Sequence, residues 1–204
     1  MDCSSFFGGV VATLIGVFST VLVTKKVETL KHELESKKAL KRLYIELADL
    51  CEECKDNLSE LKDTYYRTWH IEKGYQVDAM WAGVSIPKPP NTMILESHID
   101  KSFEDLTKEQ RIGIRAILHL CRQIDDSITS LTRQMGDGKI SSVSVKNYMS
   151  ILCALYHLSL NMKEQEGRFV KINKRPEDVQ ESVFKSLGID LSCDACAGYQ
   201  VVVS

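Results

Sequence analysis

Apolar residues first form an unbroken run near the beginning of the chain. Residues 6–23 read FFGGVVATLIGVFSTVLV, eighteen residues without a charged side chain. As a helix, this stretch would be about 27 Å long, close to the hydrocarbon thickness of a bilayer. A lysine pair, Lys25 and Lys26, follows it at once. We therefore expect residues 6–23 to cross a membrane rather than to form a buried core helix.

The charges that flank the apolar run predict its orientation. Asp2 is the one charged side chain ahead of it, whereas lysines and arginines are frequent between residues 25 and 42. Basic residues beside a membrane span stay on the cytoplasmic side, so we expect the N-terminus outside and the remainder of the chain in the cytosol. A cleavable secretory signal is not expected, because the apolar run lacks a basic region before it.

Small residues recur every fourth position along the predicted span. Such residues let two helix backbones approach closely within a membrane. We expect this face to pack against a second copy or a partner helix. The alternative is that small residues are simply common in spanning helices. The predicted packing face consists of Gly8, Ala12, Gly16 and Thr20.

The pattern changes to a helical period after the apolar run. Residues 25–42 are rich in charge and carry only a thin apolar stripe at Val27, Leu30 and Leu34, which indicates a solvated helical stalk. From Leu40 to Tyr65, apolar residues follow steps of three and four. About three and a half heptads suggest a coiled coil. Packing into a helical bundle of the same chain explains the stripe more simply.

Glycines and prolines interrupt the pattern at residues 71–91. This composition predicts an ordered but irregular connection, and such connections often carry function. The candidate contact surface here comprises Trp81, Pro87, Pro89 and Pro90.

Helical signals return near residue 92. Thr107 and Gln110 have the spacing of a capping box, which predicts a helix from Lys108 to about residue 136. A further helix is expected over 142–166, and Pro176 and Gly188 have the positions of the first turn and the end of another. The tail at 191–204 is ambiguous between a short strand and disorder. The predicted fold is all-α: an anchor at 1–24, a stalk at 25–42, an antiparallel bundle of four or five helices at 43–190, and the tail.

Composition narrows the function classes. The net charge of −2 gives no reason to expect nucleic acid as a partner. The seven cysteines are an odd number, which favours a reducing compartment over a disulfide framework. Two C-x-x-C pairs, Cys51 with Cys54 and Cys193 with Cys196, would supply four thiolates to a zinc ion if folding brought them together. Unpaired core and tail cysteines are the simpler interpretation, so no cofactor is expected.

One helix carries a second candidate for chemistry. Arg115 and His119 lie one turn apart, but their spacing differs from that of helical ribonucleases of the HEPN class, and we expect His119 to pack between helices.

The sequence favours a membrane-anchored, non-catalytic interaction protein that presents a binding or self-association surface to the cytosol. The alternative is an enzyme or metal or redox sensor that uses the cysteine pairs or the Arg115 helix. The identity of the partner does not follow from the sequence.

Overall fold

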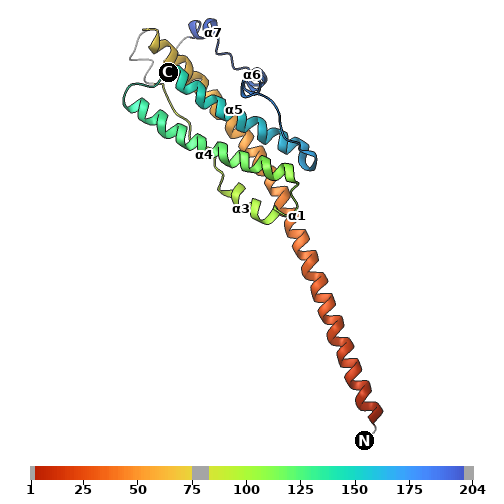
Figure 1. Cartoon of the computed structure of the whole chain (residues 1–204). Coiled ribbons are helices and arrows are strands. Elements are labelled where there is room, and N and C mark those ends of the chain that lie inside the picture. Colours follow the sequence, from red (N-terminus) through yellow and green to blue (C-terminus); the bar gives the residue numbers. More distant parts are fainter. Residues whose placement is uncertain (1–2, 75–82, 200–204) are drawn as a thin grey trace.

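The computed structural model describes residues 3–74 and 83–199, and within these ranges the side chains of 3–17, 93, 100 and 101 are not described. The described part is all-helical, as predicted, and contains no strand. Figure 1 shows the arrangement of its helices. They are α1 (Cys3–Glu72), α3 (Met93–Ser102), α4 (Lys108–Gly136), α5 (Ser142–Gln165), the 3₁₀ turn η1 (Glu166–Arg168), α6 (Pro176–Leu187) and α7 (Cys193–Ala197).

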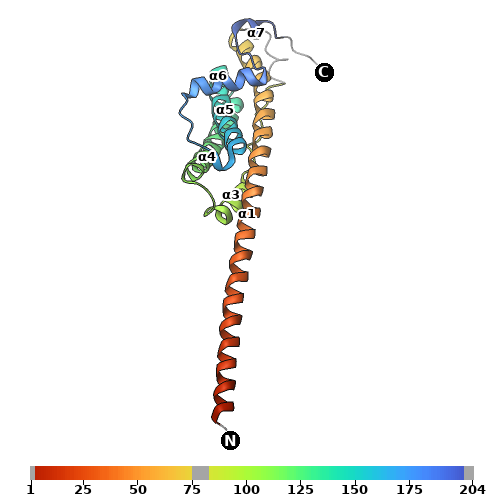
Figure 2. The same ribbon diagram turned by 90° about the vertical axis from the view of Figure 1, so that its right-hand side faces the viewer.

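Helix α1 is a long rod that leaves the bundle at its N-terminal end (Figures 1 and 2). Its 70 residues correspond to about 105 Å at the rise of an α-helix. Every described side chain from Phe18 to Glu35 is exposed, and burial begins at Ser36, whose hydroxyl donates to the Asp105 carboxylate at 2.7 Å. The first half of α1 therefore projects alone, and the second half belongs to the bundle.

The second half of α1 forms the core together with α4 and α5. Helix α5 runs antiparallel to α1. At its start, the Ser142 hydroxyl donates to the carboxylate of Glu72, near the end of α1. At its end, the Gln110 amide donates both to the Glu166 carbonyl and to the hydroxyl of Tyr44, in the middle of α1. The core side chains follow the predicted apolar stripes. They include Leu43, Leu47, Leu58 and Leu61 of α1, Ile117 and Ile124 of α4, and Tyr148, Met149, Leu152, Leu155 and Met162 of α5.

Helix α4 runs parallel to α1, which differs from the predicted all-antiparallel bundle. The reason is the segment 83–92, which returns along α1 before α4 begins. The Thr64 hydroxyl donates to the Ser85 carbonyl at 2.7 Å, and the Asn57 amide donates to the Lys88 carbonyl at 3.1 Å. This return brings α3 and the start of α4 back to the middle of α1.

Helix ends follow the predicted local signals. The Thr107 hydroxyl accepts from the Gln110 N–H while the Gln110 side chain accepts from the Thr107 N–H, which is a complete capping box. Pro176 begins α6, and Gly188 ends it with a φ of +67°, a left-handed conformation that favours glycine. The tail differs from both predicted alternatives, because residues 193–197 form the short helix α7 after an N-cap at Ser192.

Among the residues that the structure describes, no helix combines the length and the apolar character that a membrane crossing requires. The predicted span at 6–23 therefore receives no support from them. Its residues 6–17 have side chains outside the described part, and residues 18–23 continue into the exposed rod.

Candidate functional site

The exposed half of α1 presents one continuous apolar stripe. Val23, Val27, Leu30 and Leu34 are each more than half exposed, and they follow one another at steps of four, three and four. Side chains at this spacing lie on one face of a helix. We call these four residues the rod stripe. Single exposed apolar side chains are common on protein surfaces, whereas a contiguous exposed apolar surface marks an interaction site, so the rod stripe is the clearest candidate for one.

The rod stripe continues the predicted small-residue face of the span. Thr20 is exposed and precedes Val23 by three residues, so both lie on the same face of α1. The structure does not describe the side chains of the other predicted members of that face, which are Gly8, Ala12 and Gly16. The structure describes this face from Thr20 to Leu34, and its extension to Gly8 is a prediction from the sequence.

The predicted loop surface is largely covered in the structure. Pro87 and Pro90 are buried against α1, whereas Pro89 is exposed, and Trp81 lies outside the described residues. These prolines are covered because hydrogen bonds tie segment 83–92 to α1. In one of them, the Asn91 N–H donates to the Glu53 carboxylate at 3.0 Å. Pro87 and Pro90 are thus covered within their own bundle, and Pro89 is the member of the predicted contact surface that the structure shows exposed.

The two C-x-x-C pairs lie at different levels of α1. Cys51 and Cys54 are buried in the middle of the helix, where the Cys51 thiol faces the Tyr156 carbonyl. Cys193 and Cys196 lie in α7 at the far end, where the Cys196 carbonyl is 2.7 Å from His70 Nε2. From Cys54 to His70 the helix rises about 24 Å. The structure therefore does not join the four thiols, and its described residues contain no group of three metal-ligating side chains.

Other cysteines surround Cys54 instead. Burial is the main cause that raises the pKa of the Cys54 thiol well above its ordinary value, and the neighbouring thiols of Cys51, Cys121 and Cys153 raise it further. Burial also raises the pKa of Cys51, Cys121 and Cys153 to about 12 each. These four thiols are protonated at neutral pH, and reactive or metal-binding cysteines are thiolates. The cluster acts as apolar core packing.

Arg115 and His119 are both exposed on α4. Neither residue lines a described cavity. Other residues of α4 do line one: Glu109, Ile112, Gly113, Ala116 and Leu120. The expectation that His119 packs between helices is wrong, because the buried face of α4 passes through Ile114 and Ile117 and leaves His119 on the solvent side.

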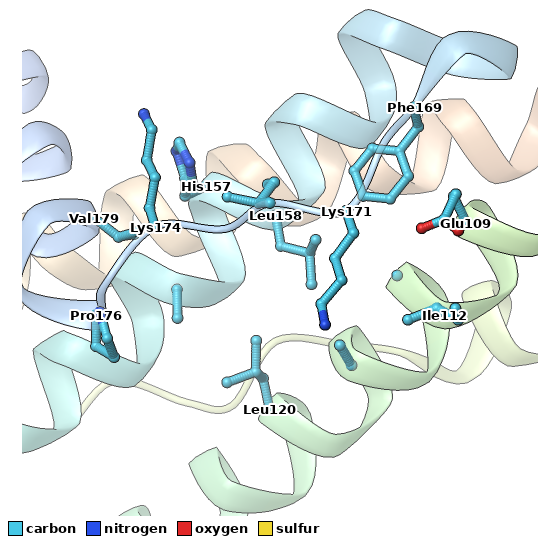
Figure 3. Close-up of a pocket in the computed structure, with 14 residues that line it drawn as sticks. Glu109, Ile112, Leu120, His157, Leu158, Phe169, Lys171, Lys174, Pro176 and Val179 are labelled. Atoms are coloured by element: carbon cyan, nitrogen blue, oxygen red, sulfur yellow. The ribbon is translucent and has the colours of Figure 1, made fainter.

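Sequence reasoning missed a cavity between α4, α5 and the segment that joins η1 to α6 (Figure 3). It holds about 260 Å³. Ala154, His157 and Leu158 of α5 form one wall, and Phe169 of the joining segment forms another. A signal in the sequence that could have indicated it is Gly113 within α4, which faces Phe169: a Cβ there would lie 3.0 Å from the ring.

Comparison with known proteins gives no assignment: no protein family, curated protein or solved structure matches this chain. Its function has to be inferred from its own residues.

Proposed function

We propose that this chain is a membrane-anchored, non-catalytic interaction protein whose helical domain faces the cytosol. The observation that carries the proposal is α1 itself. One helix begins in the apolar run, continues as the exposed rod and ends inside the bundle. A rod that projects alone from a packed bundle has no role in folding that bundle, whereas it fits a tether that holds the bundle beside a membrane.

The composition of the apolar run supports the anchor. Eleven of its eighteen residues are Val, Leu, Ile or Phe. At about −0.3 to −0.6 kcal/mol each, they would favour insertion by roughly 3 to 7 kcal/mol. At the described end of the run, Phe18, Val21, Leu22 and Val23 are all more than half exposed. Bilayer would cover these side chains, while water leaves them as an apolar surface around the whole helix.

The rod stripe supports an interaction role at the membrane. Anchored copies share one orientation and lie in one plane, so their rods would meet side by side. The four stripe residues would then form the seam of a short parallel coiled coil beneath the small-residue face of the span. A second copy is the simplest partner for this seam, and an anchored helix of another subunit would fit the same surface.

The anchor is tested by two arginines in the middle of the apolar run. Leu14→Arg with Val17→Arg would add roughly 5 to 7 kcal/mol to the free energy of insertion, which cancels the favourable term. We expect the native full-length chain to stay in alkali-washed membranes of the expressing cells and the double variant to appear in the supernatant. Thr29→Arg with His32→Arg, on the exposed rod, adds the same charge and should remain in membranes. A native chain in the soluble fraction would refute the anchor.

A further inference from the structure

The cavity between α4, α5 and the segment 169–175 combines an apolar interior with cationic side chains. Ile112, Ala116 and Leu120 of α4 face Leu158 of α5 and Phe169 across it. Lys171 and Lys174 also line it, and Figure 3 shows that the Lys171 side chain extends toward α4 while Lys174 points the opposite way, beside His157. The cavity is therefore a hydrocarbon-lined space with an ammonium group over it.

Neither lysine has an acidic partner among the residues that the structure describes. Within the described part of the chain, no carboxylate lies within ion-pair distance of the Lys171 or Lys174 ammonium group. Glu109 is the one acidic residue among those that line the cavity, and it pairs with neither lysine. His157 adds no further positive charge at neutral pH, because burial and the nearby Lys174 lower its pKa. The charge over the cavity is thus positive, and no described carboxylate balances it.

The walls of the cavity are fixed by close packing. Phe169 is buried, and its ring lies so close to α4 that a Cβ on Gly113 would approach it to 3.0 Å and would push the ring by a few tenths of an ångström. Pro176 and Val179, from the start of α6, close one end of the cavity. Ligand sites have this character: concave, mostly apolar and largely preformed, with a few polar groups that fix the orientation of the ligand.

Size and charge together define the class of ligand. An apolar cavity of about 150 Å³ binds benzene, so the 260 Å³ here suits a hydrocarbon body of about seven to nine carbons. An anionic head group on that body would reach Lys171, and Glu109 on the rim would disfavour a dianion such as a phosphate monoester. We propose that this cavity binds a small apolar monocarboxylate, with its hydrocarbon between α4 and α5 and its carboxylate on Lys171. This site is independent of the anchor and of the rod stripe.

Octanoate and its uncharged counterpart octanamide test the proposal. The full-length chain is placed in lipid nanodiscs and titrated by calorimetry, with empty nanodiscs as the blank. Octanoate should bind, and octanamide should bind at least tenfold more weakly. Lys171→Ala should weaken octanoate by about ten- to a hundredfold, which is the worth of a hydrogen bond between charged groups, and leave octanamide unchanged. Lys139→Ala, an exposed lysine in the turn after α4, is the matched control and should bind like the native chain.

A second variant tests the cavity itself. Ala116→Phe places a ring in the hydrocarbon space and should abolish binding of both ligands, while a thermal melt reports whether the variant is folded. Absence of octanoate binding to the native chain would overturn the proposal. Equal affinity for octanamide, or native affinity in Lys171→Ala, would overturn it as well, because the cavity would then not select an anion. Native binding by folded Ala116→Phe would show that octanoate lies elsewhere.

Discussion

Gln110 shows how single polar residues organise this bundle. Its side chain is almost completely buried, yet each of its polar atoms has a partner. The amide oxygen accepts from the Thr107 N–H at 2.7 Å, and the amide nitrogen donates to the Glu166 carbonyl at 3.0 Å and to the Tyr44 hydroxyl. One residue therefore joins α1, the start of α4 and the end of α5. Loss of such a side chain leaves several buried groups without partners, which is costly.

The buried thiols predict a loss of stability in alkali. Cys51, Cys121 and Cys153 have pKa values of about 12 in the fold against an ordinary value of 9. Their contribution to the free energy of unfolding is complete below pH 9 and is lost as the pH rises toward 12, because only unfolded thiols ionise in that interval. Between pH 9 and pH 10, ionisation of each of these thiols in the unfolded state lowers the free energy of unfolding by at most about 1.4 kcal/mol.

Urea unfolding of the reduced full-length chain at pH 8 and pH 10 measures this effect. We expect a clearly lower midpoint at pH 10. The double variant Cys121→Ala with Cys153→Ala, less stable at both pH values, should lose a smaller increment between them, because two titrating thiols are gone. A midpoint that does not change with pH in the native chain would show that these thiols are not desolvated.

At the residue scale, the sequence predicted what depends on neighbours in the chain. The Thr107 capping box needs only residues three apart, and the structure has it. The apolar pattern predicted the buried face of α4 through Ile117 and Ile124 but not where that face ends, since Ile112 lies in the apolar pattern yet is 39% exposed. It also could not bring Cys121 and Cys153 to Cys54, because that convergence depends on how three separate helices pack.

At the scale of elements, α1 carries two different faces in succession. Its second half buries an apolar stripe from Leu43 onward, whereas the rod stripe from Val23 to Leu34 has no cover among the described residues. The change occurs at Ser36 and Ala39, where the bundle begins. The sequence predicted this difference, because the charge-rich segment 25–42 with its thin apolar stripe indicated a solvated stalk and the stripe from Leu40 indicated packing into the bundle; the structure places the boundary a few residues earlier, at Ser36.

The rod stripe predicts cross-linking that depends on helix face. In a chain with Cys3→Ser and Cys193→Ser, Leu30→Cys should form a disulfide-linked dimer when membranes are treated with a mild oxidant. His32→Cys, two residues further on and on the opposite face, should give little dimer. Gly16→Ile should lower the yield at position 30 if the spans also pack together. Equal yields at positions 30 and 32 would show random collision in place of a defined seam.

The order of the helices was predicted better than their directions. Short connections usually join antiparallel neighbours, and α4 and α5 follow this rule. Helix α4 lies parallel to α1 because segment 83–92 first runs back along α1, held by Thr64 and Asn57. Nothing in the local sequence of 83–92 specifies this path. It depends on side chains of α1 that lie 21 and 31 residues away in the chain.

At the scale of the whole molecule, the bundle lies at one end of a long rod and the apolar run at the other (Figures 1 and 2). Helix α7 and the segment before it cover the end of α1 that is farthest from the apolar run: His70 Nε2 contacts the Cys196 carbonyl of α7, and the Tyr66 hydroxyl donates to the Asp190 carbonyl just before it. In the proposed orientation, with the N-terminus outside, the cavity beside Lys171 and the exposed Cys193 would both lie on the cytosolic side.

Two cysteines of the native chain allow the most direct test of this account. Cys3 precedes the apolar run, and Cys193 is exposed on α7, while the other cysteines are buried or half-buried. The reagents are a maleimide and a reductant, neither of which crosses membranes. They are added to intact cells that express the chain and, in a second sample, to permeabilised cells. We predict labelling of Cys3 in intact cells and of Cys193 only after permeabilisation. If neither cysteine is labelled before permeabilisation and the chain is then recovered in the soluble fraction, the membrane anchor is contradicted.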